Sequence, residues 1–152
     1  MINFMLLISR QGKTRLTKWY NTYSAKEKAQ FIREVSTMVI GRPIKATNVV
    51  EWRDEKIVYK RYASLYFVCS IDTLHNELEA LETIHLYVES LDRYFGNVCE
   101  LDLIFNFHKA YFILDELMIG GHLQETCKRD ILRVIAAQDG LMDDNDVGLQ
   151  TK

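Results

Sequence analysis

The stretch KIVYKRYASLYFVCSI, residues 56–71, decides how this chain folds. It is rich in Ile, Val, Tyr and Phe and contains no Gly or Pro, a composition typical of a β-sheet interior. Sixteen residues exceed a usual strand of about five or six, so the stretch is predicted to form two antiparallel strands that meet near Arg61 and Tyr62. The second strand, residues 65–71, is apolar almost without interruption and therefore needs cover on both faces.

The residues before this stretch supply further strands and one helix. Ser24 and Glu27 have the spacing of a capping box, which predicts a helix beginning there, and Gly41 predicts its end. Gly12 favours a tight turn between two early strands. The predicted elements are strands over residues 2–9, 14–20 and 48–53 and a helix between Ser24 and Gly41.

The residues after the stretch are predicted to be helical. Apolar residues recur three or four apart from Asn76 until Gly96, which indicates a long amphipathic helix. Two short buried helices are expected within residues 98–117, with a break at Asn106–Phe107. Gly120–Gly121 is expected to be a flexible joint, followed by a helix over residues 126–137 and an acidic, flexible tail over residues 141–152.

The element order predicts an α+β fold in a single domain, residues 1–140. Strand, strand, helix and three strands suit a five-stranded antiparallel sheet, sandwiched by that helix and by a later helical layer with extra C-terminal helices. With 48% hydrophobic and 26% charged residues, the 152-residue chain has the composition of an ordinary globular protein. Its three cysteines, Cys69, Cys99 and Cys127, are odd in number and widely spaced, which indicates a reducing compartment.

Charge is unevenly distributed along the chain, although the formal net charge is only −2. Residues 1–62 hold 13 Lys and Arg against 5 Asp and Glu, whereas residues 63–152 hold 6 against 16. One interpretation is simply solvated faces. The other is a protein with a basic edge for an acidic peptide or headgroup and an acidic edge for a basic partner.

Motifs for catalysis, metal binding and nucleic-acid binding are weak. The glycines stand alone, without the spacing of a phosphate-binding loop. His85 and Glu89 are one helical turn apart, but no third ligand accompanies them, and a partly buried structural histidine is the preferred interpretation. The basic residues are dispersed through strands and a helix, so nucleic acid is not an expected partner. We therefore expect no enzyme, no metal and no cofactor.

A set of aliphatic residues allows two interpretations. If the long helix packs over the central strand, these residues line a groove for aliphatic side chains, or else they are ordinary core, because composition does not separate the two. Ala63 and Leu65 are assigned to a central strand and polar Asn97 to the joint after the helix. The set also includes Val88, Val98, Leu101 and Leu103.

Three segments resemble a known family. They are SRQGKTRLTKWY, EWRDEKIVYKRYASLYF and YFGNVCELDLIFNFHKAYFILDEL, and the likeness extends over residues 2–138. They resemble the small (sigma) chain of the clathrin adaptor complexes. The likeness is greatest to the sigma chain of the first complex, which works at the trans-Golgi network and endosomes. The plasma-membrane endocytic complex is the alternative.

The resemblance implies a longin-like fold, no cofactor and no catalysis. It implies a heterotetramer with a gamma-type large subunit (alpha-type in the alternative), a beta-type large chain and a medium chain, in contact with clathrin and membrane indirectly. The family holds the acidic dileucine signal, [DE]xxxL[LI], of membrane cargo. The positions that match its leucine site are Ala63, Leu65, Val88, Asn97, Val98, Leu101 and Leu103, with Arg15 near the acidic residue of the signal.

Two related classes share the expected fold. A longin-type coat subunit such as a coatomer zeta chain would lack the leucine site. A SNARE with a longin head would need a following heptad helix and a membrane anchor, and the sequence shows neither.

Overall fold

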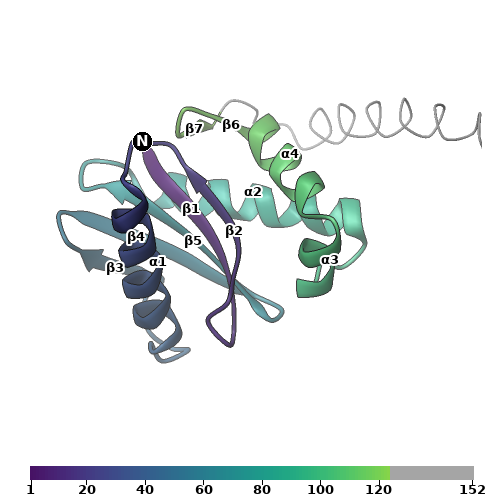
Figure 1. The fold of residues 1–152 in the computed structure, drawn as a ribbon, viewed down its shortest axis with the longest axis horizontal. Coiled ribbons are helices and arrows are strands. Elements are labelled where there is room, and N and C mark those ends of the chain that lie inside the picture. Colours follow the sequence, from purple (N-terminus) through teal and green to yellow (C-terminus); the bar gives the residue numbers. More distant parts are fainter. Residues whose placement is uncertain (124–152) are drawn as a thin grey trace, which may run out of the picture.

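The computed structural model describes residues 1–123, which form a five-stranded sheet with helices on both faces (Figure 1). The predicted α+β architecture is therefore confirmed. Residues 124–152, which hold the expected last helix and acidic tail, lie outside the described residues. The elements are β1 (Ile2–Ser9), β2 (Thr14–Trp19), α1 (Ala25–Ile40), β3 (Val49–Trp52), β4 (Glu55–Tyr62), β5 (Leu65–Asp72), α2 (Glu77–Phe95), α3 (Glu100–Phe105), α4 (Phe107–Leu117), β6 (Met118–Ile119) and β7 (His122–Leu123).

The large sheet has the strand order β2-β1-β5-β4-β3, and all its neighbouring strands are antiparallel. Tyr62 pairs with Leu65, so the turn between β4 and β5 consists of Ala63 and Ser64. The predicted corner at Arg61 and Tyr62 is thus placed too early. Ala63 lies in this turn with a φ of 53°. The sequence had assigned it to the central strand, and that assignment is wrong.

The central strand β5 is covered on both faces, as its composition predicts. Leu65, Phe67 and Cys69 belong to the core on the side of α2, α3 and α4. Val68 belongs to the core on the side of α1. β1 is buried throughout in the same way. Each large apolar side chain buried here contributes about 1.5–3 kcal/mol relative to its exposed state.

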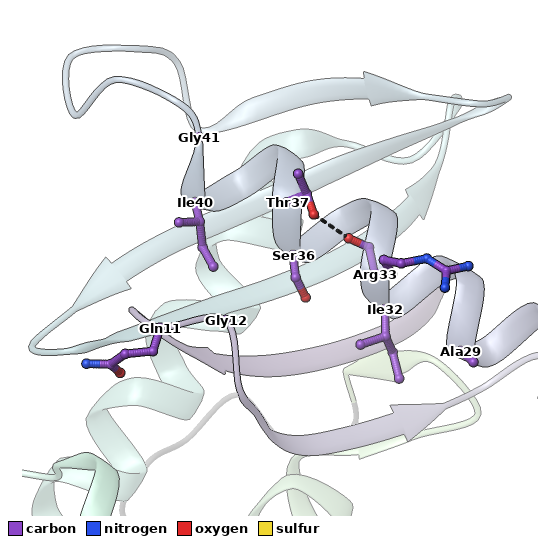
Figure 2. Close-up of a pocket in the computed structure, with 9 residues that line it drawn as sticks. All are labelled: Gln11, Gly12, Ala29, Ile32, Arg33, Ser36, Thr37, Ile40 and Gly41. Atoms are coloured by element: carbon purple, nitrogen blue, oxygen red, sulfur yellow. Dashed lines mark hydrogen bonds between the residues drawn. The ribbon is translucent and has the colours of Figure 1, made fainter.

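Helix α1 covers its face of the sheet with an aromatic cluster. The Phe31 ring lies 5.0 Å from the Trp52 ring and 6.4 Å from the Phe4 ring, measured between centroids. A groove of about 550 Å³ lies between α1 and the turn from β1 to β2 (Figure 2). Gln11 and Gly12 of that turn line one side of this groove.

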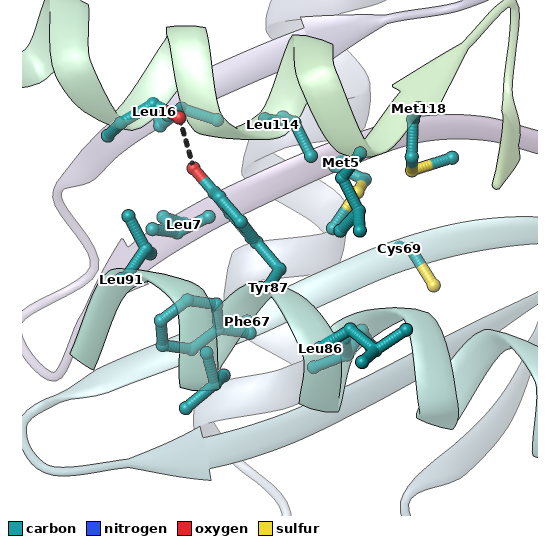
Figure 3. Close-up of a cluster of buried hydrophobic side chains, with 14 of the residues drawn as sticks. Met5, Leu7, Leu16, Phe67, Cys69, Leu86, Tyr87, Leu91, Leu114 and Met118 are labelled. Carbon is teal, nitrogen blue, oxygen red and sulfur yellow. Dashed lines mark hydrogen bonds between the residues drawn. The ribbon is translucent and has the colours of Figure 1, made fainter. Parts of the chain in front are cut away.

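Helices α2 and α4 cover the opposite face (Figures 1 and 3). Tyr87 of α2 is fully buried, and its hydroxyl donates a hydrogen bond to the Ala110 carbonyl of α4 at 2.8 Å. Burial raises the pKa of the Tyr87 phenol well above its ordinary value, because the phenolate would lose its hydration. The phenol therefore stays protonated and joins the two helices.

The structure corrects several details of the predicted helical layer and turns. The break at Asn106 is confirmed, but α3 is not a buried helix, because Leu101 and Phe105 are 60% and 74% exposed. Gly120–Gly121 is the turn between β6 and β7, where both glycines have positive φ, and not a loose joint. The predicted third strand is shorter than expected, with bounds Val49–Trp52.

The capping box at the start of α1 is confirmed, and we expect it to stabilise the fold measurably. The Ser24 hydroxyl accepts a hydrogen bond from the Glu27 amide at 3.1 Å, and the Glu27 carboxylate accepts one from the Ser24 amide at 3.4 Å. Ser24→Ala should lower the free energy of unfolding by about 1 kcal/mol, measured by urea denaturation. Thr22→Ala, at an exposed neighbouring position, should change it by less than about 0.5 kcal/mol. Equal effects of the two substitutions would contradict a capping role.

Candidate signal-binding site

The eight residues predicted to bind a sorting signal come from six parts of the fold. Arg15 lies on β2, Ala63 in the β4–β5 turn and Leu65 at the start of β5. Val88 lies on α2, and the others lie on α3 or in the junction between α2 and α3, residues 96–99. This last group consists of Asn97, Val98, Leu101 and Leu103.

Four of the predicted residues lie together in one buried cluster. Leu65, Val88, Val98 and Leu103 are at most 3% exposed and belong to the core between the sheet and α2. In this conformation they pack as core and do not line an open groove. Of the two interpretations that composition left open, ordinary core describes these four side chains here.

Three other predicted residues lie at the surface beside that cluster. Ala63 and Asn97 are exposed, and the Leu101 side chain is 60% exposed. Asn97 follows Gly96, and both have positive φ, 68° and 66°. This left-handed pair turns the chain sharply out of α2, which is why the junction does not continue the helix.

Asp92 connects the junction to the β4–β5 hairpin. One oxygen of its carboxylate accepts hydrogen bonds from the Tyr62 hydroxyl at 2.8 Å and from the Val98 amide at 3.0 Å. Its backbone carbonyl accepts hydrogen bonds from the Gly96 and Asn97 amides. Because Tyr62 precedes Ala63 and Val98 follows Asn97, this single carboxylate brings the two exposed parts of the site close together. Sequence analysis did not identify Asp92.

Arg15 is already paired in this structure. Its Nε and Nη2 atoms lie 2.8 Å and 2.7 Å from the same oxygen, Oε1 of Glu100. The two side chains are only 24% and 22% exposed, so this ion pair is less hydrated than most surface pairs. Glu100 is the first residue of α3, and the pair therefore holds α3 against β2. No local sequence signal indicates a contact across 85 positions.

Ion pairs between the two halves of the chain neutralise part of the unevenly distributed charge. Lys18 of β2 pairs with Asp115 of α4 at 2.8 Å, and Lys56 of β4 pairs with Glu77 of α2 at 2.9 Å. Basic residues of the first half thus lie against acidic residues of the second. The remaining cations include Arg10, Lys13 and Arg61, which are exposed and make no ion pair within residues 1–123.

These unpaired cations lie at the end of the sheet that carries the Ala63 turn. The Arg10 amide donates a hydrogen bond to the Ser64 carbonyl at 3.2 Å, so the β1–β2 turn adjoins the β4–β5 turn. Arg61 lies in β4 just before Ala63. Exposed cations without an ion pair among residues 1–123 thus lie beside the exposed part of the site, and they raise the electrostatic potential there.

The other candidate features lie elsewhere. None of the eight predicted residues lines the groove beside α1 (Figure 2). His85 pairs with Glu89 at 2.8 Å, but its side chain is 50% exposed, so it is not the partly buried histidine that we expected.

No cluster of three or more His, Cys, Asp or Glu side chains suited to a metal ion occurs within the described residues. Within residues 1–123, no helix has both the length and the apolar character needed to cross a membrane.

Comparison with known proteins identifies the family. The family model described as "Clathrin adaptor complex small chain" matches residues 1–142. The chain belongs to this family. It is 63% identical over 143 residues to the Arabidopsis thaliana AP-1 complex subunit sigma-1, covering 94% of this chain and 89% of that protein. It is 56% identical over 146 residues to the Homo sapiens AP-1 complex subunit sigma-1A, covering 96% and 92%.

A structural comparison agrees with the family assignment. A chain of the "Homology model of the full-length AP-3 complex in a stretched open conformation" matches with a TM-score of 0.75 and 28% identity, covering 97% of this chain and 99% of that one. The resemblance to sigma chains and the longin-like fold are thereby confirmed. Adaptor small chains are non-enzymatic coat components, so this chain is not an enzyme.

The hydrogen bond between Tyr62 and Asp92 has a measurable consequence. Donation to the Asp92 carboxylate, with some desolvation, raises the pKa of Tyr62, because the phenolate would lose this bond and face the negative charge. Asp92→Asn should lower that pKa towards the ordinary tyrosine value in an NMR titration of labelled tyrosines. Asp102→Asn, which instead removes the negative charge that accepts from the Cys99 amide, should leave it unchanged. An unaltered Tyr62 pKa in Asp92→Asn would contradict this contact.

Proposed function

We propose that this chain is the sigma subunit of an AP-1-type heterotetrameric clathrin adaptor in vesicle-mediated protein transport. In this proposal it assembles with a gamma-type large subunit, a beta-type large subunit and a medium chain, and works in the cytoplasm on trans-Golgi network and endosome membranes and clathrin-coated vesicles. The observation that carries the proposal is the 63% and 56% identity, over nearly the full chain, to proteins named as AP-1 sigma subunits.

Exposed apolar side chains on α3 and α4 support assembly with other subunits. Phe105 and Phe107 are 74% and 56% exposed, and Ile104 is 40% exposed. A run of large apolar residues on neighbouring turns is unusual for a surface that faces only water. Burial against a partner subunit would remove this surface from solvent.

We further propose that the chain binds acidic dileucine signals, [DE]xxxL[LI], together with its large subunit. The predicted leucine site surrounds the end of α2, with exposed Ala63, Asn97 and Leu101 beside the buried aliphatic cluster. Signal leucines would reach that cluster by displacing α3 and the junction before it. The helix α3 has only six residues, so a small movement would open the site.

Energetics support a weak and reversible interaction of this kind. Burying each leucine of a signal is worth about 1.5–3 kcal/mol before entropic costs. Opening the closed cluster subtracts from that gain. The cations Arg10, Lys13 and Arg61 favour the approach of an acidic signal, and Arg15 supplies a guanidinium for its carboxylate.

An exposed position tests the leucine site without disturbing the core. Val88 is only 3% exposed, so a charge there would test folding as well as binding. Leu101→Asp should weaken binding of a dileucine peptide to the assembled complex at least about tenfold in fluorescence anisotropy, because one 1.4 kcal/mol contact corresponds to that factor. Leu78→Asp is the control, since Leu78 is 73% exposed at the opposite end of α2. Equal binding by both variants would place the leucine site elsewhere.

The role of Arg15 is tested with paired peptides. Arg15→Ser should weaken a peptide with an acidic residue before the dileucine more than a matched peptide with Ala in that position. We expect a difference of about threefold to tenfold, because a charge-assisted contact is lost for the first peptide alone. Titration calorimetry of the assembled complex measures both affinities. Equal losses for the two peptides would argue against a contact with the acidic residue.

The identity of the complex is tested by affinity purification of the tagged chain from its own cells. Recovery of a gamma-type large subunit with beta-type and medium chains would support the AP-1 assignment. Recovery of an alpha-type subunit would move the chain to the plasma-membrane complex. Recovery of coatomer subunits would indicate a zeta-like chain without dileucine binding.

A further inference from the structure

Glu100 is already bound to the guanidinium of Arg15, which the acidic residue of a signal would need. Two nitrogens of Arg15 converge on one Glu100 oxygen at 2.8 Å and 2.7 Å. The pair is about three-quarters buried, with 24% and 22% of the side chains exposed. A second carboxylate brought to the same nitrogens would face the negative charge of Glu100 at close range, and like charges this close repel strongly.

We propose that Glu100 is an internal competitor of the signal's acidic residue, so that recognition is an exchange of one carboxylate for another at Arg15. This inference rests on the proposed dileucine binding. The acidic residue of a signal would displace the Glu100 side chain into solvent and take its place. A neutral residue in that position would leave the internal pair intact and gain nothing from Arg15.

The exchange also links the acidic residue to the leucine site. Glu100 is the first residue of α3, and α3 carries Leu101 and Leu103 of the predicted site. While the pair to Arg15 is intact, α3 is held against β2 and Leu103 stays buried at 1% exposure. Release of Glu100 removes one of the contacts that keep α3 in this position. An acidic residue would therefore ease entry of the leucines, in addition to making its own contact.

Glu100→Gln tests this competition with little change of shape. Its amide oxygen still accepts from Arg15, but without charge, so the contact holding Arg15 weakens while the side-chain volume stays the same. Asp115→Asn is the matched control, because Lys18–Asp115 is also an ion pair from β2 to the helical layer, at 2.8 Å. Both variants remove one negative charge from the same side of the sheet.

The measurement is the affinity of the assembled complex for two peptides that differ only by Glu or Ala at the acidic position of the signal. Glu100→Gln should tighten binding of the Glu peptide by about threefold to tenfold and that of the Ala peptide by clearly less, because both peptides gain from a looser α3 but the Glu peptide alone gains from a freed Arg15. Asp115→Asn should leave the ratio of the two affinities at its wild-type value. Thermal unfolding of each complex checks that the variants keep the fold.

The opposite results would overturn the proposal in distinct ways. If Glu100→Gln weakens the Glu peptide, Glu100 positions Arg15 for the signal and does not compete with it. If both peptides gain equally in Glu100→Gln, or if Asp115→Asn gives the same gain, general electrostatics explain the effect. If the wild-type complex binds neither peptide, the proposed dileucine binding itself fails, and this inference fails with it.

Discussion

The two neighbouring strands β1 and β5 are buried on both faces, and the rest of the structure depends on this constraint. A strand with apolar side chains on both sides is stable only if each side is covered. Helix α1 covers one face, and the helical layer after β5 covers the other. The long α2 therefore has to run across the sheet, and the chain that leaves it returns along the same face towards β2. That return path produces the junction and the short α3 of the candidate site.

The candidate site lies where this helical layer is least extensive. Core side chains such as Val88 are held in place by the long helix α2. The helix α3, in contrast, has six residues, and Leu103 alone among these six is buried. Because α3 buries little apolar surface, polar contacts supply part of what holds it and the preceding junction in place. Asp92 holds the junction, and the Arg15–Glu100 pair holds α3. Polar contacts of this kind are individually weaker than an extensive core, so they are suited to opening for a ligand.

Local patterns predicted most of the fold, because their causes are local. The capping box at Ser24, the termination of α2 at Gly96 and the break at Asn106 depend on residues within a few positions of each other. The β4–β5 turn was misplaced because Ala63 is not a typical residue for positive φ, so nothing in the sequence marks it. The Glu100 contact lay beyond prediction, because it joins residues that only the folded chain brings together. Exposure of Leu101 was missed for a similar reason: periodicity within so short a helix does not define a face.

Under the proposed dileucine binding, closure of the site sets an upper limit on how tightly it can hold a signal. Two buried leucines are worth about 3–6 kcal/mol before costs, if each contributes the usual value. Opening the cluster around Val98 and separating Arg15 from Glu100 both oppose that gain. The net affinity is then the difference between terms of similar size, which makes it weak and strongly dependent on each feature of the signal. If the proposal holds, a closed site of this kind should respond to a complete signal, with acid and leucines together, and little to a lone hydrophobic pair.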